Sequence, residues 1–147
     1  GRSWVQPNFQ PSNISRRGIF ALDNLWDGLG SIVVDNPHIK YYSGKVTLYS
    51  TYNKEARDAL MYFLNYFFND PDGLISPVEA VSISSDIEEN IPPVINNYMS
   101  LSPTMRSFGT VLNQYFGEVE ETMILVKIED IYAEKKSRYI DSYQPSV

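Results

Sequence analysis

The chain has 147 residues, of which 43% are hydrophobic, 14% aromatic and 20% charged, and it contains no cysteine. This composition is typical of a folded globular protein, and the length suits one domain with its own hydrophobic core. The absence of cysteine excludes disulfides, thiolate metal sites and thiol nucleophiles. No run of about 18 apolar residues occurs, so the sequence predicts no transmembrane segment.

The net charge of −6 is unevenly distributed along the chain. Residues 1–57 carry seven Lys and Arg against four Asp and Glu, whereas residues 58–147 carry five against fourteen. The overall acidity argues against nucleic-acid binding, because phosphate contacts need clustered cations. The basic N-terminal part could instead meet an anionic surface or the acidic half of a second copy.

The first 16 residues are predicted to form an extended arm. They combine prolines and polar residues with Trp4 and Phe9, and Arg16 and Arg17 lie where the arm ends. Aromatic residues beside arginines are typical of a segment that packs on a partner. We therefore expect these four residues to belong to an interface.

Several strands are predicted after the arm. Short apolar runs at Ile19–Leu22 and Ser31–Asp35 each indicate a strand. The β-rich run Ile39–Tyr52 contains Ser43-Gly44 near its centre, which predicts a hairpin.

A helix is predicted over residues 54–69. Asn53 can cap its N-terminus, because an Asn side chain accepts hydrogen bonds from first-turn amides. Apolar residues recur at three- and four-residue spacing and predict a core face: Ala56, Ala59, Leu60, Phe63, Leu64 and Phe67. Tyr62, Tyr66 and Phe68 extend the apolar surface beyond that face, so we expect them to form a second contact with a partner.

The remaining elements are a strand, two helices and a second strand. Val78–Ser84 alternates as a strand does, and Val94–Met99 indicates a short helix. A second helix is predicted over residues 102–116, with Gly117 as its stop and with an apolar face of Met105, Phe108, Leu112 and Phe116. Glu121–Ile131 is apolar on both faces, which predicts a central strand.

This order of elements predicts an α+β fold. We expect a single domain over residues 17–132, with a mixed or mainly antiparallel sheet and two to three helices packed on it. Residues 133–147 are polar and are predicted to form a surface tail.

One loop has the spacing of a metal-binding motif. From its third position onward it resembles the EF-hand calcium loop, with Asp70, Asp72, Gly73, Ile75 and Glu79 at the matching positions. The resemblance implies Ca²⁺ as a cofactor, with Asp70, Asp72 and Glu79 as its ligands. It departs at the first loop position, where Phe68 stands. An Asp-Pro-Asp-Gly turn at a helix end explains the same residues without a metal.

No pattern in the sequence predicts a catalytic residue. His38 is the single histidine and lies in a polar segment beside Pro37. The acidic runs at residues 86–89 and 118–121 could hold a cation or supply a carboxylate pair for a hydrolase. Short acidic runs are more often solvated surface.

These observations together favour a non-enzymatic domain for protein interaction or self-assembly. The predicted hairpin and helix at residues 45–69 are similar to elements of negative-strand virus matrix proteins, which are small, α+β and self-associating. The richness in Asn, Ile, Tyr and Ser, with few Ala, is typical of an AT-rich genome and fits a viral structural or accessory protein. We expect its partner to be another copy or another protein, and a soluble location, cytoplasmic or virion-associated rather than secreted. Two alternatives stay open: a small-ligand or Ca²⁺ module that uses the Asp70–Glu79 loop, and a carboxylate-based hydrolase.

Overall fold

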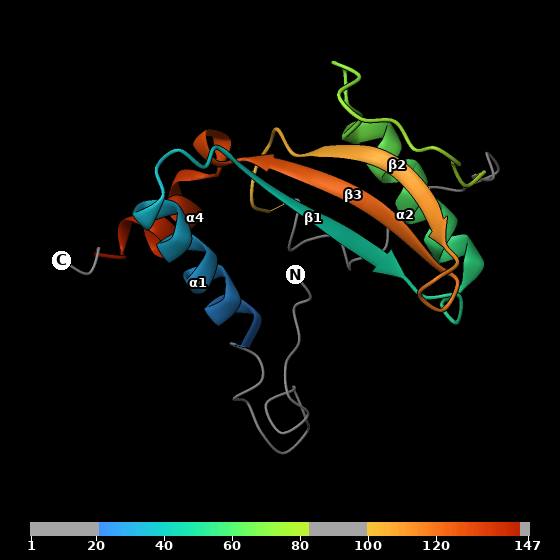
Figure 1. Cartoon of the computed structure of the whole chain (residues 1–147), viewed down its shortest axis with the longest axis horizontal. Coiled ribbons are helices and arrows are strands. Elements are labelled where there is room, and N and C mark those ends of the chain that lie inside the picture. Colours follow the sequence, from blue (N-terminus) through green and yellow to red (C-terminus); the bar gives the residue numbers. More distant parts are fainter. Residues whose placement is uncertain (1–20, 83–99, 145–147) are drawn as a thin grey trace. The chain divides into compact units, whose positions relative to one another are not determined.

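The structure is a computed structural model that describes residues 21–82 and 100–144. Its described residues form three α-helices and a three-stranded antiparallel sheet, which confirms the predicted α+β class (Figure 1). They fall into two compact units, one within residues 41–132 and one that combines residues 21–40 with residues 133–144. None of the described helices is long and apolar enough to cross a membrane.

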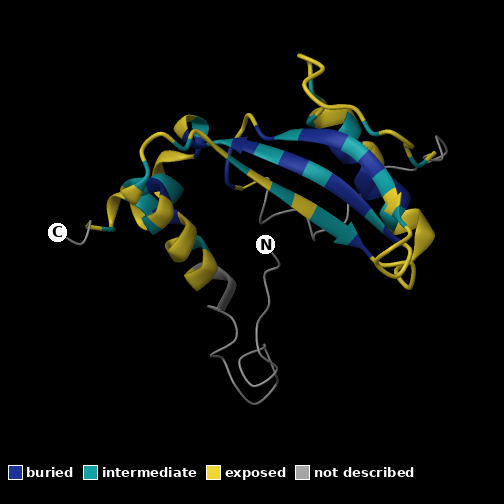
Figure 2. Ribbon diagram, viewed as in Figure 1, coloured by how far each residue is buried: buried dark blue, intermediate teal, exposed yellow. Residues whose placement is uncertain are grey.

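The 41–132 unit is built on a sheet of β1 (Tyr41–Leu48), β2 (Arg106–Asn113) and β3 (Val119–Lys127). The strand order is β1-β3-β2, and both neighbours run antiparallel to β3. β3 is therefore the central strand of this sheet, as its apolar sequence predicted. Buried residues recur along β3 and β2 in Figure 2, whereas β1 is more exposed.

β1 is one continuous strand, so the hairpin predicted over Ile39–Tyr52 is wrong. Ser43 and Gly44 lie inside β1 and pair with Leu125 and Ile124 of β3. The sequence pattern identified β-forming residues correctly, but the hairpin prediction assumed a local partner. The real partner is a strand far along the chain, and pairing with it does not require a turn at Gly44.

β2 occupies the region where a helix was predicted over residues 102–116. Its pairing with β3 shifts register between Ser107 and Thr110, which marks a bulge, and Gly109 inside the bulge has φ +80°. A bulge adds one residue to a strand and displaces the inside-outside alternation. Phe108 and Thr110 are both buried as a result. Of the apolar face predicted for the helix, Met105 and Phe108 are buried, whereas Leu112 and Phe116 are exposed.

Helix α2 (Lys54–Phe67) confirms the predicted helix and its cap. The Asn53 side chain accepts a 3.0 Å hydrogen bond from the backbone N–H of Ala56. The helix packs against β2, and its buried residues are Asp58, Ala59, Leu60, Met61, Phe63 and Leu64. Two residues assigned to the core face are exposed, namely Ala56 and Phe67, because they lie in the first and last turns.

The strand predicted over Val78–Ser84 is reduced to a single bridge. Ala80 pairs with Val111 at the outer edge of β2, and Val81 donates a 2.9 Å backbone hydrogen bond to Thr110. Residues 83 and 84 lie outside the described residues, as does the helix predicted over Val94–Met99.

The other unit contains α1 (Ala21–Asp35), which replaces the two strands predicted there. Apolar residues recur along α1 at three- and four-residue spacing, as in an amphipathic helix: Leu25, Trp26, Leu29, Ile32 and Val33. α4 (Ala133–Lys136) and η5 (Ser137–Asp141) follow in the segment predicted as a tail, and η5 packs on α1. Within η5, Tyr139 is buried, with its ring centroid 6.5 Å from that of Trp26.

Gly30 allows η5 to approach α1 closely. A Cβ atom at this position would lie 1.6 Å from the carbonyl oxygen of Tyr139, which no side chain can tolerate. A Cβ atom placed on Gly28, two residues earlier, would meet no packed atom within 4 Å. Both glycines lie inside α1, and Gly30 is required by packing.

Candidate functional site

The side chains of Glu120 and Glu121, which are adjacent in β3, point to opposite faces of the sheet. Glu120 forms an ion pair of 2.6 Å with Arg57 of α2, so its side chain lies on the face that α2 covers. Successive side chains of a strand point in opposite directions. Glu121 therefore lies on the other face, where it meets residues of β1 and β2.

On that face, a polar network crosses all three strands. Lys45 of β1 lies 2.7 Å from one carboxylate oxygen of Glu121, and the Asn113 side chain of β2 donates a 3.0 Å hydrogen bond to the other. The side chain of Glu121 is 9% exposed, whereas that of Lys45 is 58% exposed. The accessible ammonium group of Lys45 is thus held in place by a largely buried carboxylate. An ammonium group held in this way can bind an anionic group.

Asn113 also connects this network to the turn between β2 and β3. Its side-chain oxygen accepts a 3.2 Å hydrogen bond from the backbone N–H of Tyr115. The turn ends in two residues with positive φ, Gly117 at +70° and Glu118 at +52°. Gly117 was predicted to end a helix, because glycine readily adopts the left-handed conformation. It does adopt that conformation, but in the turn of a hairpin.

The pair of Arg57 and Glu120 is enclosed between α2 and the sheet. Their side chains are 12% and 14% exposed. The Nε atom of Arg57 and the Oε2 atom of Glu120 are buried without a hydrogen-bond partner. This pair holds helix to sheet, and neither group is accessible enough to act on a substrate.

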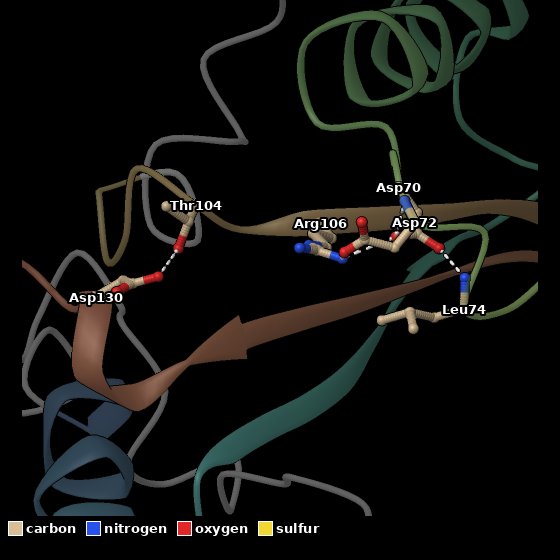
Figure 3. Close-up of polar contacts among 6 residues, drawn as sticks. All are labelled: Asp70, Asp72, Leu74, Thr104, Arg106 and Asp130. Carbon is tan, nitrogen blue, oxygen red and sulfur yellow. Dashed lines mark hydrogen bonds and ion pairs between the residues drawn. The ribbon is translucent and has the colours of Figure 1, made fainter.

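The side chains of Asp70 and Asp72 lie close together, as the sequence predicted, but both form ion pairs with an arginine. Arg106 of β2 lies 2.9 Å from a carboxylate oxygen of Asp70 and 2.6 Å from one of Asp72 (Figure 3). The Asp70 carboxylate also accepts hydrogen bonds from the backbone N–H groups of Asp72 and Leu74. The loop therefore has the hydrogen bonding of an Asp-Gly turn, with Gly73 at φ +62°.

These contacts shift the ionisation of the Asp70 carboxyl. Desolvation acts to raise the pKa of Asp70, but the two backbone N–H groups and Arg106 outweigh it and hold the pKa below its ordinary value. The carboxylate is thus stabilised by the protein itself at neutral pH.

Glu79, the third residue of the predicted calcium site, is exposed and is not seen in this cluster. Across residues 21–82 and 100–144, no group of three or more possible His, Cys, Asp or Glu ligands is found. The Arg106 guanidinium already supplies a positive charge to both aspartates. Calcium binding by this loop stays a prediction.

A second group of contacts lies where β2 begins and β3 ends. The Thr104 hydroxyl donates a 2.6 Å hydrogen bond to Asp130, which follows β3 in η4 (Ile128–Asp130) (Figure 3). Lys127 lies 3.0 Å from Glu129 and 3.8 Å from Asp130, and the hydrogen bond with Glu129 is the main cause that raises the pKa of Lys127. These contacts join the chain segments that flank the sheet.

The predicted interface residues are only partly described. Trp4, Phe9, Arg16 and Arg17 lie outside the described residues. On α2, Tyr62 and Tyr66 are exposed and stack with their centroids 5.8 Å apart, whereas Phe68 is half-buried and packs on Phe63. Whether these side chains form an interface stays a prediction.

The network around Glu121 was not predicted as a unit. Glu121 belonged to an acidic run, but Lys45 and Asn113 were assigned to other elements. A charged residue next to the apolar run of a central strand was the available signal, since such a residue needs a partner when it is buried. His38 is exposed in the loop before β1.

Comparison with known proteins places the chain beside bacterial enzymes. It is 42% identical to a protein of Phocaeicola vulgatus named glycine N(alpha)-acyltransferase, over 169 residues that cover 97% of this chain and 52% of the relative. A protein of Bacteroides thetaiotaomicron with the same name is 41% identical over 97% of the chain and 50% of the relative. No protein-family model and no solved structure matches.

The chain therefore spans about half the length of the curated relatives it matches. The 169 aligned positions also exceed the 147 residues of the chain, so the relatives have residues inside the matched region that this chain lacks.

These similarities overturn the function inferred from the sequence. Both relatives are named as enzymes, so the prediction of a non-enzymatic, self-assembling viral protein of matrix type is wrong. The resemblance to matrix proteins used a predicted hairpin before α2, and the structure has a single strand, β1, in its place. The relatives' name also does not fit the alternatives of a calcium-binding module or a hydrolase. The chain is instead similar, over nearly all its length, to half of two proteins named as acyltransferases.

Proposed function

We propose that the chain is part of an enzyme that transfers an acyl group to the amino nitrogen of glycine. The observation that carries this proposal is the 41–42% identity to two proteins named glycine N(alpha)-acyltransferase, over 97% of the chain. Such identity along almost the whole chain makes a common fold and a common type of reaction the simplest explanation.

The chemistry sets requirements that the chain must help to meet. The amino nitrogen of glycine attacks the carbonyl carbon of an activated acyl donor, such as a thioester. A C–N bond forms, the bond to the leaving group breaks, and the nitrogen loses a proton. An enzyme accelerates such a two-substrate reaction mainly by holding both reactants in the correct geometry. A rigid sheet that carries fixed polar groups, as around Glu121, is suited to that task.

Because the chain matches only about half of each relative, the proposal is tested in a chimeric protein. We would replace the matching half of the Phocaeicola vulgatus relative with this chain, express the chimera in cells supplied with ¹³C-glycine, and measure labelled N-acylglycine by mass spectrometry. We expect labelled product from the chimera and from the intact relative, and none from the relative that lacks the matching half. A folded, abundant chimera without product, beside an active relative, would contradict the proposal.

The isolated chain answers a second question. Purified protein mixed with ¹³C-glycine and a medium-chain acyl thioester tests whether the 147 residues suffice for catalysis. We expect weaker product formation than from the chimera, because the chain matches only half of each relative.

The predicted association with another copy or another protein is compatible with an enzyme. It is supported by the exposed aromatic side chains of α2, Tyr62, Tyr66 and Phe67. Light scattering over a concentration series measures it directly, and a constant monomer mass would count against it.

A further inference from the structure

We propose that Lys45 binds the carboxylate of the acceptor glycine, with Glu121 and Asn113 fixing the position of its ammonium group. This inference rests on the proposed function, and it identifies which residue recognises the acceptor. Glycine has two polar groups, and its amino group must be free to react, so the carboxylate is the group available for recognition.

The geometry separates an accessible cation from a fixed support. Glu121 is largely buried, and the carboxylate oxygen not paired with Lys45 is bound by Asn113 across the sheet. Lys45 reaches Glu121 from the neighbouring strand while more than half of its side chain stays exposed. An ammonium group has three N–H donors, and Glu121 takes one of them, so Lys45 retains donors for an incoming carboxylate.

Other cations of the 41–132 unit are less suited to this role among the residues that the structure describes. Arg57 is enclosed with Glu120, and Arg106 already holds two aspartates. Lys127 lies between Glu129 and Asp130. Each of these groups is either buried or neutralised by more than one carboxylate.

Lys54 is the informative comparison. It is as accessible as Lys45 and is paired with a buried carboxylate, that of Asp58. However, both residues lie on one turn of α2, so the pair is local to the helix. The Lys45 pair joins strands whose residues are 76 positions apart and includes a third strand through Asn113. Lys54 is therefore a matched control for charge, exposure and pairing.

The nearby Glu121 charge limits the affinity. It offsets part of the attraction between Lys45 and an anion, so we expect weak binding of glycine, with a Kd of about 1 mM. The carboxylate also distinguishes glycine from glycinamide, which has the same amino group but no negative charge.

The first experiment measures binding to the purified 147-residue chain by NMR, with glycine and glycinamide as probes. We expect glycine to shift the backbone signals around Lys45 and glycinamide to bind at least about tenfold more weakly. Lys45→Met should lose the preference for glycine, Lys45→Arg should keep it, and Lys54→Met should behave as the unmodified chain does. Circular dichroism establishes that each variant is folded.

Several results would overturn the inference. They are equal binding of glycine and glycinamide, no glycine binding by the folded chain, or unchanged glycine binding by Lys45→Met.

A second experiment separates this inference from the proposed function. In the chimeric relative, Lys45→Met should raise the KM for glycine at least about tenfold with a smaller change in kcat, and Lys45→Arg should restore the KM. If N-acylglycine is formed and the KM does not respond to Lys45→Met, the acyltransferase function stands and the glycine site is wrong. If no product is formed but glycine binding depends on Lys45, the site stands and the function is wrong.

Discussion

Glu120 and Glu121 are neighbours in β3, yet each binds a cation on a different face of the sheet. Glu120 pairs with Arg57 of α2, and Glu121 pairs with Lys45 of β1. The alternation of side chains along a strand assigns one carboxylate to the packing of the unit and the other to an accessible network. The two glutamates therefore do not act together on one face, and the other acidic run, at residues 86–89, lies outside the described residues.

Removal of Arg57 should destabilise the protein strongly. Arg57→Met leaves the carboxylate of Glu120 enclosed without its partner, and an uncompensated buried charge costs about 3 kcal/mol of unfolding free energy. The double variant Arg57→Met with Glu120→Leu should recover to within about 1 kcal/mol, because it removes both charges. Urea unfolding of both single variants and the double variant measures this coupling. Equal stability of Arg57→Met and the unmodified chain would show that the pair contributes nothing.

Substitution of two neighbouring glycines in α1 should have opposite effects. Gly30→Ala places a methyl group against the carbonyl oxygen of Tyr139, so we expect a loss of about 2 kcal/mol or more and displacement of η5. Gly28→Ala meets no atom within 4 Å and should stabilise the helix by about 0.5–1 kcal/mol. Thermal unfolding and hydrogen exchange at Tyr139 distinguish the two. Similar behaviour of both variants would contradict the close contact between α1 and η5.

The Asp70 turn should make stability depend on pH in the acid range. Because the pKa of Asp70 is lowered in the folded protein, its stabilising contribution is present above 3.8, its ordinary value, and is lost as pH falls through the lower folded value. Asp70→Asn should therefore be less stable than the unmodified chain at neutral pH, and the difference should disappear in strong acid. Asp72→Asn is the control, since Asp72 is 60% exposed whereas Asp70 is 4% exposed. A difference that persists unchanged in strong acid would argue against ionisation as its cause.

Tyr42 should produce the opposite dependence in the alkaline range. Burial raises the pKa of Tyr42 from 10.0 to about 12, because the phenolate is poorly solvated in the folded protein. The folded state therefore holds the phenolic proton more tightly, and this contribution is lost as pH rises from 10.0 toward the folded value. The stability of Tyr42→Phe should fall less at alkaline pH than that of the unmodified chain. Tyr41→Phe changes an exposed position, so its stability should fall as much as that of the unmodified chain. Absorbance of the phenolate in the near ultraviolet follows the titration.

The sequence predicted the features that depend on neighbouring residues. The α+β class, the helix α2 with its Asn53 cap and the central position of β3 all follow from local capping, periodicity or apolar runs. The turn that brings Asp70 toward Asp72 follows from local chemistry as well, although its cation is Arg106 from a distant strand.

The tertiary structure decided the features that depend on distant partners. β1 is a strand rather than a hairpin because β3 pairs with both of its halves, and residues 106–113 form a strand rather than a helix because they pair with β3 as well. α1 requires glycine at position 30 because the backbone of Tyr139 lies against it. The contact of Lys45 with Glu121 and Asn113 likewise required three strands from separate parts of the chain. Periodicity records which side of an element is buried, but pairing across long separations depends on the free energy of the whole fold, so no local pattern specifies it.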